Sequence, residues 1–125
     1  MAAGLESART VCLATFRRDG RQVNTPVWVV QLGDRLYVNT EAASAKVKRI
    51  RNNPRIRIAP STMGGKPLAD WRDGTARLVE DAALVRRVND AIRAKYGLQA
   101  QLYALLALFS RRVRDRVIVE VQLSR

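Results

Sequence analysis

Two tight-turn signals divide the first 40 residues at regular spacing, and they constrain the fold more than any other feature. Asp19-Gly20 follows a β-branched and aromatic stretch, and Gly33-Asp34 follows a second, longer one. Short apolar runs joined by such dipeptides are typical of β-hairpins. We therefore expect three antiparallel strands, at residues 10–16, 22–32 and 35–40.

The rest of the chain mixes strand and helix patterns. Ser44 offers an N-cap and Pro54 ends the helix that follows, whereas Asp81 and Gly97 bracket a second helix. These signals and the apolar spacing predict strands at 55–60, 71–80 and 117–123, and helices at 44–53, 82–96 and about 98–109. The order predicts an α+β fold, a six-stranded antiparallel barrel, with residues 1–125 as a single domain.

Composition narrows the possible chemistry. The chain has one cysteine and no histidine, which excludes an internal disulfide, a histidine metal site and histidine-dependent triads. Any reaction must rely on a bound cofactor or on carboxylate, lysine, tyrosine or hydroxyl groups. No signal peptide is evident, and the apolar run 102–109 is far shorter than the roughly 20 residues that span a bilayer. A reducing cytoplasm is the expected location.

A basic helix carries much of the net charge of +12. Its four cations are followed by two arginines on the next strand: Lys46, Lys48, Arg49 and Arg51, then Arg55 and Arg57. The cluster is consistent with a solvated helix face, a nucleic-acid-binding surface or a binding site for a phosphorylated cofactor. Free N–H groups at the helix start favour phosphate. Specific nucleic-acid binding lacks support, because aromatic side chains do not alternate with these cations. Charge alone favours the solvated face.

The stretch 24–30, NTPVWVV, interrupts the second strand with a proline. Pro26 cannot donate a ladder hydrogen bond, so neighbouring main-chain groups are available to a planar ligand, beside the flat ring of Trp28. The alternative is that Pro26 marks an ordinary edge and Trp28 fills the core.

Three stretches together resemble one family: TFRRDGRQVNTPVWVV, DRLYVNTEAASAKVKRIRNNPRIRIAP and WRDGTARLVED. The chain resembles the pyridoxamine-phosphate-oxidase-like split β-barrel proteins, and among them the deazaflavin (coenzyme F420)-dependent oxidoreductases. The likeness covers about residues 8–96 and 117–123. It implies a split barrel of the FMN-binding type that forms a homodimer, with cofactor sites at the dimer interface.

The resemblance also distinguishes between cofactors. Flavin-binding relatives carry S-R-K at the basic helix, where this chain has Ser44 and Lys46 but Ala45 between them. Relatives that bind FMN place an arginine and a lysine on the second strand, where this chain has about Thr25 and Val30. Deazaflavin relatives show the T-P-V-W form instead, as here.

The resemblance thus implies an F420-dependent oxidoreductase that transfers a hydride between reduced deazaflavin and an unsaturated organic substrate. The implied cofactor contacts are Asn24, Thr25, Pro26, Val27, Trp28, Ser44, Lys46, Lys48, Arg49, Arg51, Arg55 and Arg57. Lys46 is the expected phosphate ligand, and the other cations would meet the cofactor's carboxylate tail. No catalytic residue and no metal ligand is predicted. The alternatives are an FMN-binding or other cofactor-binding split barrel, and a non-enzymatic basic binding module.

Overall fold

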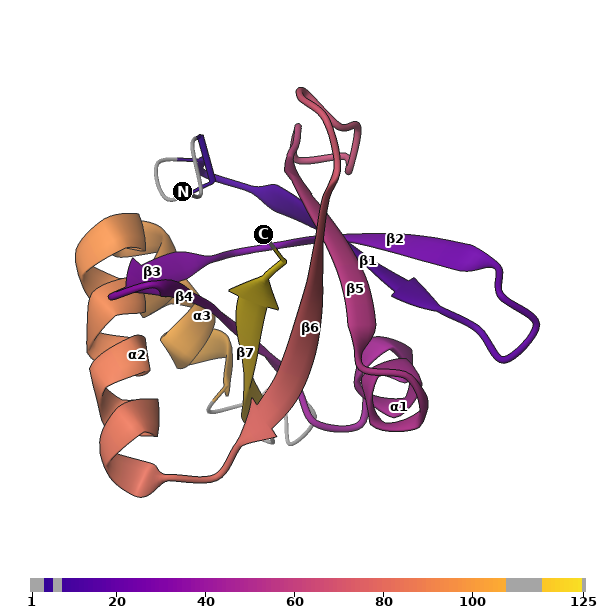
Figure 1. The fold of residues 1–125 in the computed structure, drawn as a ribbon. Coiled ribbons are helices and arrows are strands. Elements are labelled where there is room, and N and C mark those ends of the chain that lie inside the picture. Colours follow the sequence, from indigo (N-terminus) through magenta and orange to yellow (C-terminus); the bar gives the residue numbers. More distant parts are fainter. Residues whose placement is uncertain (1–3, 6–7, 108–115, 125) are drawn as a thin grey trace.

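The computed structural model describes residues 4–5, 8–107 and 116–124. Its strands are β1 (Val11–Phe16), β2 (Gln22–Val27), β3 (Val30–Leu32), β4 (Arg35–Glu41), β5 (Arg55–Pro60), β6 (Arg72–Val79) and β7 (Arg116–Leu123). Its helices are α1 (Ala45–Asn52), α2 (Ala82–Tyr96) and α3 (Leu98–Ala107). Figure 1 shows a strongly curled sheet with α1 at one end and the α2–α3 pair at the other. The expected α+β split barrel is confirmed.

The sheet is antiparallel and its strand order is β2-β1-β5-β6-β7-β4-β3. The first and last strands of this order are consecutive in the chain, since only Trp28 and Val29 separate them. One segment of chain therefore runs along both edges of the sheet and curls it into a barrel (Figure 1).

The expected count of six strands is wrong by one, because residues 22–32 form two strands rather than one. β2 pairs with β1, and β3 pairs with β4. Between them, the Val29 main chain bonds to a side chain instead of a strand: its N–H donates to the Tyr96 hydroxyl at 3.0 Å, and that hydroxyl donates to its carbonyl at 3.2 Å. The ladder is thus interrupted where α2 contacts the barrel.

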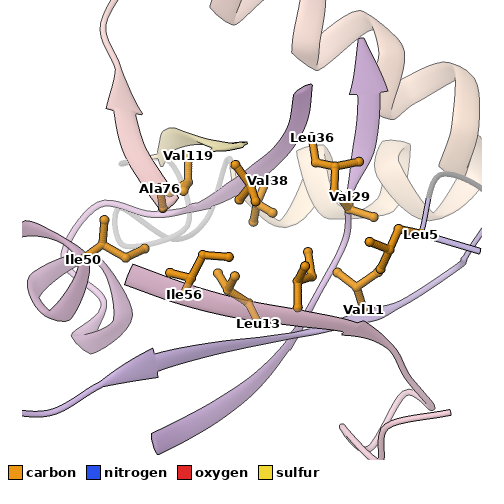
Figure 2. Close-up of a cluster of buried hydrophobic side chains, with 12 residues drawn as sticks. Leu5, Val11, Leu13, Val29, Leu36, Val38, Ile50, Ile56, Ala76 and Val119 are labelled. Atoms are coloured by element: carbon orange, nitrogen blue, oxygen red, sulfur yellow. The ribbon is translucent and has the colours of Figure 1, made fainter. Parts of the chain in front are cut away.

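Two apolar clusters hold the fold together. The first fills the barrel and includes Leu13, Ile56 and Val119, all fully buried (Figure 2). Ile50 of α1 enters the same cluster, so the basic helix is anchored to the barrel wall. Burial of each such side chain contributes about 1.5–3 kcal/mol. The second cluster lies on the outside of the sheet under α2, and includes Val88.

The helix ends follow the expected signals. The Asp81 side chain accepts a hydrogen bond from the Ala83 N–H at 3.0 Å, and Gly97 ends α2 with a φ of 55°. α3 leaves an apolar face uncovered, formed by Leu98, Leu102, Leu105 and Leu106. Residues 108–109 of the expected third helix lie outside the described residues. Among those described, no helix is both long and apolar enough to cross a membrane.

Candidate cofactor-binding site

The first turn of α1 contains an unsatisfied buried hydroxyl. Ser44 occupies the N-cap position with extended backbone angles, as expected, but its side chain makes no capping hydrogen bond. Its Oγ is buried and has no hydrogen-bond partner in the part of the chain that the structure describes. Leaving such a group unpaired costs about 1–3 kcal/mol. A ligand oxygen would remove that cost.

Lys46 lies on the same turn and is half-buried. Burial lowers the pKa of its ammonium group, and the nearby charges of Arg116 and Arg49 lower it further, while Glu41 acts in the opposite direction. The first turn of α1 contains no acidic residue. The charged lysine is therefore held at a cost, and an anion at this turn would offset it. Together with Ser44 and the helix N–H groups, Lys46 makes a fitting cradle for a phosphate.

One face of α1, which includes Ala45 of the first turn, borders a cavity. Lys48 and Arg49 line this cavity of about 790 Å³ together with Arg17, Arg18 and Arg21 of the β1–β2 turn. Arg49 is held in place by its Nε, which donates to Thr15 Oγ1 at 2.6 Å. These three turn arginines are not among the predicted cofactor contacts, because the Asp19-Gly20 pair in the run RRDGR indicates a turn rather than a binding site.

The remaining predicted cations have other surroundings. Arg57 Nε forms an ion pair with Asp73 at 2.9 Å, and the Arg55 guanidinium lies 4.8 Å from the centre of the Phe16 ring. Arg51 is exposed in the last turn of α1. The structure therefore places the predicted cations in several different environments.

The predicted ring-binding segment lies along an edge strand. β2 is at the end of the strand order, so Pro26 has the edge position that its missing N–H requires. Asn24 and Pro26 are exposed, whereas Thr25 and Val27 are half-buried. A Cβ placed on Gly65 would lie 3.5 Å from Pro26 Cδ, so the glycine-rich loop at 61–68 approaches this edge.

Trp28 is held by α2 rather than by the barrel interior. Its ring stacks on Tyr96 with centroids 4.4 Å apart and planes 9° from parallel. Lys95 Nζ donates to the Val29 carbonyl at 2.7 Å and strengthens the same junction. Tyr96 thus fixes both the indole plane and the break between β2 and β3. Its position at the end of a helix 67 residues away gave no hint of this partnership.

The positions that would bind FMN phosphate on the second strand are unsuited to it. Val30 is 3% exposed and packs in the cluster under α2. Thr25 is half-buried in β2. Neither can supply the cation that the FMN-binding pattern places there. The described residues also contain no group of three histidine, cysteine or acidic side chains that could hold a metal ion.

A family model described as "Pyridoxamine 5'-phosphate oxidase" matches residues 1–125. No curated protein sequence matches the chain. A conserved hypothetical protein from Mycobacterium tuberculosis has a similar structure, with a TM-score of 0.73 at 23% identity over 99% of this chain and 78% of that one. HutZ, a heme storage protein from Vibrio cholerae, has a TM-score of 0.71 at 17% identity, over 97% of this chain and 85% of HutZ. An F420 reductase has a TM-score of 0.61 at 19% identity, over 99% of this chain and 93% of that one. At identities this low, the likeness to solved structures concerns the fold alone.

Proposed function

The chain belongs to the pyridoxamine 5'-phosphate oxidase family, and on that premise we propose that it is a reductase that uses the deazaflavin coenzyme F420. The observation that carries the proposal is at the start of α1: the buried Ser44 hydroxyl, which has no hydrogen-bond partner among the described residues, lies on the same turn as the half-buried ammonium of Lys46. When bound, the reduced deazaflavin would supply a hydride to an unsaturated organic substrate. The protein itself would bind the cofactor, orient its ring and shield the ring from water.

The phosphate end of the cofactor would lie against α1. Ser44 Oγ would donate to a phosphate oxygen, and Lys46 would offer its charge from the same turn. The barrel keeps this turn in place through Val47 and Ile50, which are both buried. A phosphate bound there satisfies a hydroxyl that otherwise lacks a partner and makes the lysine charge favourable.

The ring would lie along the edge of β2. Pro26 leaves one main-chain donor missing, and the neighbouring groups of Thr25 and Val27 are at the edge of the sheet, where a planar ring can reach them. Trp28 adjoins this segment with its plane set by Tyr96. A rigid strand and a fixed indole would orient the ring and exclude water from one side of it.

Two observations favour deazaflavin over FMN. The second-strand positions Thr25 and Val30 cannot provide the FMN pattern of cations, and Val30 is buried. The fold is also shared with an F420 reductase. A homodimer that completes the site from a second copy remains part of the proposal, as the resemblance implies.

Titration of the purified protein with F420 and, separately, with FMN tests the proposal through the fluorescence of each cofactor. We expect F420 to bind and FMN to bind at least about tenfold more weakly, because the FMN phosphate contacts of the second strand are missing. Oxidation of reduced F420 should then be followed against quinones, enones and bilins. Tight binding of FMN without binding of F420 would end the proposal.

Lys46→Ala tests the phosphate assignment. Loss of one charge-assisted contact should weaken F420 binding about tenfold or more. Arg86→Ala is the matched control, since it removes one positive charge from an exposed position on α2. Equal affinity of the Lys46→Ala and Arg86→Ala proteins would show that the phosphate binds elsewhere.

A further inference from the structure

The 61–68 loop, which projects from the ends of β5 and β6, carries two apolar side chains in water (Figure 1). Met63 is 81% exposed and Leu68 is 64% exposed, and neither belongs to the two apolar clusters of the core. Within the described residues, the other large apolar side chains that are mostly exposed are the four leucines of α3. Apolar groups gathered on a surface commonly mark a binding site. The function proposed above uses α1 and β2 and assigns nothing to this loop.

The main chain of the loop is held by hydrogen bonds at its tip and at its base. At the tip, Thr62 N–H donates to the Lys66 carbonyl and Gly65 N–H donates to the Thr62 carbonyl, both at 3.0 Å. Lys66 N–H also donates to Thr62 Oγ1 at 3.1 Å. At the base, Leu68 N–H donates to the Pro60 carbonyl at 2.8 Å. The loop therefore presents its exposed side chains from a well-bonded main chain.

The tip of the loop reaches across β1 to the strand that is proposed to bind the cofactor ring. β1 lies between β5 and β2 in the sheet, yet a Cβ placed on Gly65 would lie 3.5 Å from Pro26 Cδ. Gly65 has a φ of 90°, which favours glycine at this close approach. Met63 precedes Gly65 by two residues, so their Cα atoms lie within about 7 Å of each other. The exposed Met63 is therefore next to the Pro26 end of β2.

The chemistry of this surface favours an uncharged, flat ligand. Pro26 is exposed and adds a third apolar side chain to those of Met63 and Leu68. The 61–68 loop contains no acidic residue, and Lys66 is its one charged residue. Apolar side chains gain from contact with apolar ligand area, which both partners remove from water. The unbranched, polarisable thioether of Met63 can also adjust to ligands of different outline.

We propose that Met63 and Leu68 form the apolar wall of the substrate site and bind a flat, uncharged, unsaturated fused-ring compound against Pro26. The assignment rests on the proposed function, which supplies the reaction that the substrate undergoes. A substrate that accepts a hydride must lie against the reacting ring, and the proposed ring position along β2 adjoins the loop at Pro26. Met63 and Leu68 thus select the substrate, whereas Ser44 and Lys46 bind the cofactor.

Titration of the cofactor-free protein with naphthoquinone tests the site directly. The two tryptophans of the chain are suitable reporters, because Trp28 is two residues from Pro26 and Trp71 is three residues from Leu68. We expect naphthoquinone to quench their fluorescence along a saturable curve. Quenching that does not saturate reports collisions in solution and overturns the assignment. Because no cofactor is present, F420 binding without naphthoquinone binding would overturn this assignment alone, and the reverse would overturn the proposed function alone.

The double variant Met63→Ser/Leu68→Ser removes the apolar wall. Both side chains are exposed, so the fold should persist, and the thermal midpoint checks this. Naphthoquinone affinity should fall about tenfold, whereas F420 affinity should stay within about twofold of the parent. The matched control is Leu102→Ser/Leu105→Ser, which removes two exposed apolar side chains from α3. It should keep the parent affinity for naphthoquinone within about twofold.

Turnover of naphthoquinone by the F420-loaded protein separates substrate binding from a structural role. Met63→Ser/Leu68→Ser should raise the KM for naphthoquinone about tenfold and leave kcat within about twofold, since the wall contacts the substrate before and during the reaction alike. Met63→Leu keeps an apolar side chain and should retain the parent KM. Equal weakening in the loop variant and its α3 control would mean that naphthoquinone binds apolar surface in general. That result, or a fall in kcat with KM unchanged, would overturn the assignment.

Discussion

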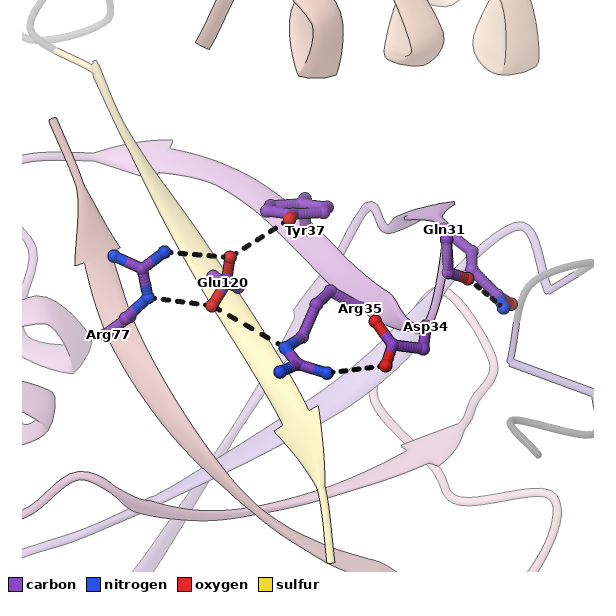
Figure 3. Close-up of polar contacts among 7 residues, drawn as sticks. Gln31, Asp34, Arg35, Tyr37, Arg77 and Glu120 are labelled. Atoms are coloured by element: carbon purple, nitrogen blue, oxygen red, sulfur yellow. Dashed lines mark hydrogen bonds and ion pairs between the residues drawn. The ribbon is translucent and has the colours of Figure 1, made fainter. Parts of the chain in front are cut away.

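The fold contains two polar sites that differ in one respect: the Glu120 carboxylate is fully paired, whereas among the described residues Ser44 Oγ has no hydrogen-bond partner and the half-buried Lys46 forms no ion pair. Glu120 is 9% exposed and accepts hydrogen bonds from the Tyr37 hydroxyl at 3.0 Å and from Arg77 at 2.7 and 3.1 Å. Arg35 Nε lies 3.9 Å away. Figure 3 shows these contacts converging on the carboxylate from the neighbouring strands β4 and β6.

The pKa directions express the same difference. The hydrogen bonds from Arg77 keep the pKa of Glu120 below its ordinary value despite burial, so the charged form is favoured in the fold. Burial lowers the pKa of Lys46, so there the charged form is disfavoured. The satisfied charge of Glu120 stabilises the sheet, whereas the proposed function assigns the less satisfied charge of Lys46 to a bound phosphate.

Glu120→Ala should have the largest effect on stability. It leaves the Tyr37 hydroxyl, on a residue that is 5% exposed, without its acceptor. Arg77 can return to water because its side chain is 63% exposed. We expect the free energy of unfolding to fall by about 2–3 kcal/mol, measured by urea denaturation. Glu80→Ala at an exposed position is the control, with a change within about 0.5 kcal/mol. Similar losses in both variants would mean that the Glu120 contacts add nothing.

Lys46→Met should separate stability from binding. Because the buried ammonium is held at a cost, its replacement by an apolar chain of similar length should leave the thermal midpoint unchanged or raise it. F420 affinity should nevertheless fall about tenfold. A variant that is less stable than the parent would place Lys46 with Glu120 among the structural charges.

Ser44→Ala tests whether the missing cap bond is real. An N-cap serine ordinarily contributes about 1 kcal/mol, but here the side chain makes no capping bond and its buried hydroxyl is unpaired among the described residues, so Ser44→Ala should leave the free energy of unfolding unchanged or raise it. Asp81→Ala is the matched comparison, because Asp81 does cap α2 and its loss should cost about 1 kcal/mol. F420 affinity should fall several-fold in Ser44→Ala alone. An equal loss of stability in both variants would contradict the unpaired state of Ser44.

The free energy of unfolding should depend on pH in opposite ways at Glu120 and Lys46. These are the smallest of the predicted effects. Since the folded pKa of Glu120 is lowered, its contribution is present above the ordinary glutamate pKa and is lost as pH falls through the folded value. The advantage of the parent over Glu120→Ala should therefore shrink in acid.

The pKa of Lys46 is lower in the folded protein than in the unfolded chain, so the charged ammonium lowers the free energy of unfolding near neutral pH. That destabilisation is relieved as pH rises through the lowered pKa toward the ordinary lysine value. Any advantage of Lys46→Met over the parent should therefore shrink in alkali. Urea denaturation across pH checks both trends, and an advantage of Lys46→Met that grows with pH would refute the second.

Local sequence determined most of the elements. The Asp19-Gly20 turn, the Asp81 cap of α2 and the Gly97 stop all lie where the residue types placed them. Each depends on hydrogen bonds or backbone angles within a few residues, so the chain needs no tertiary contact to specify it. The edge position of Pro26 follows for the same reason, since a proline cannot donate to a second neighbouring strand.

Tertiary structure decided the rest, because the partners are distant in sequence. The break between β2 and β3 depends on Tyr96, which lies 67 residues beyond Val29, and Glu120 meets Tyr37 across 83 residues. The chain's basic residues were visible in the sequence as one cluster. Only packing assigned Lys46 to a half-buried turn beside Ser44, Arg57 to an ion pair with Asp73, and Lys48 with Arg49 to a cavity shared with the β1–β2 turn. The sequence shows which residues are charged, but whether a charged group has a partner depends on which distant residues the fold brings next to it.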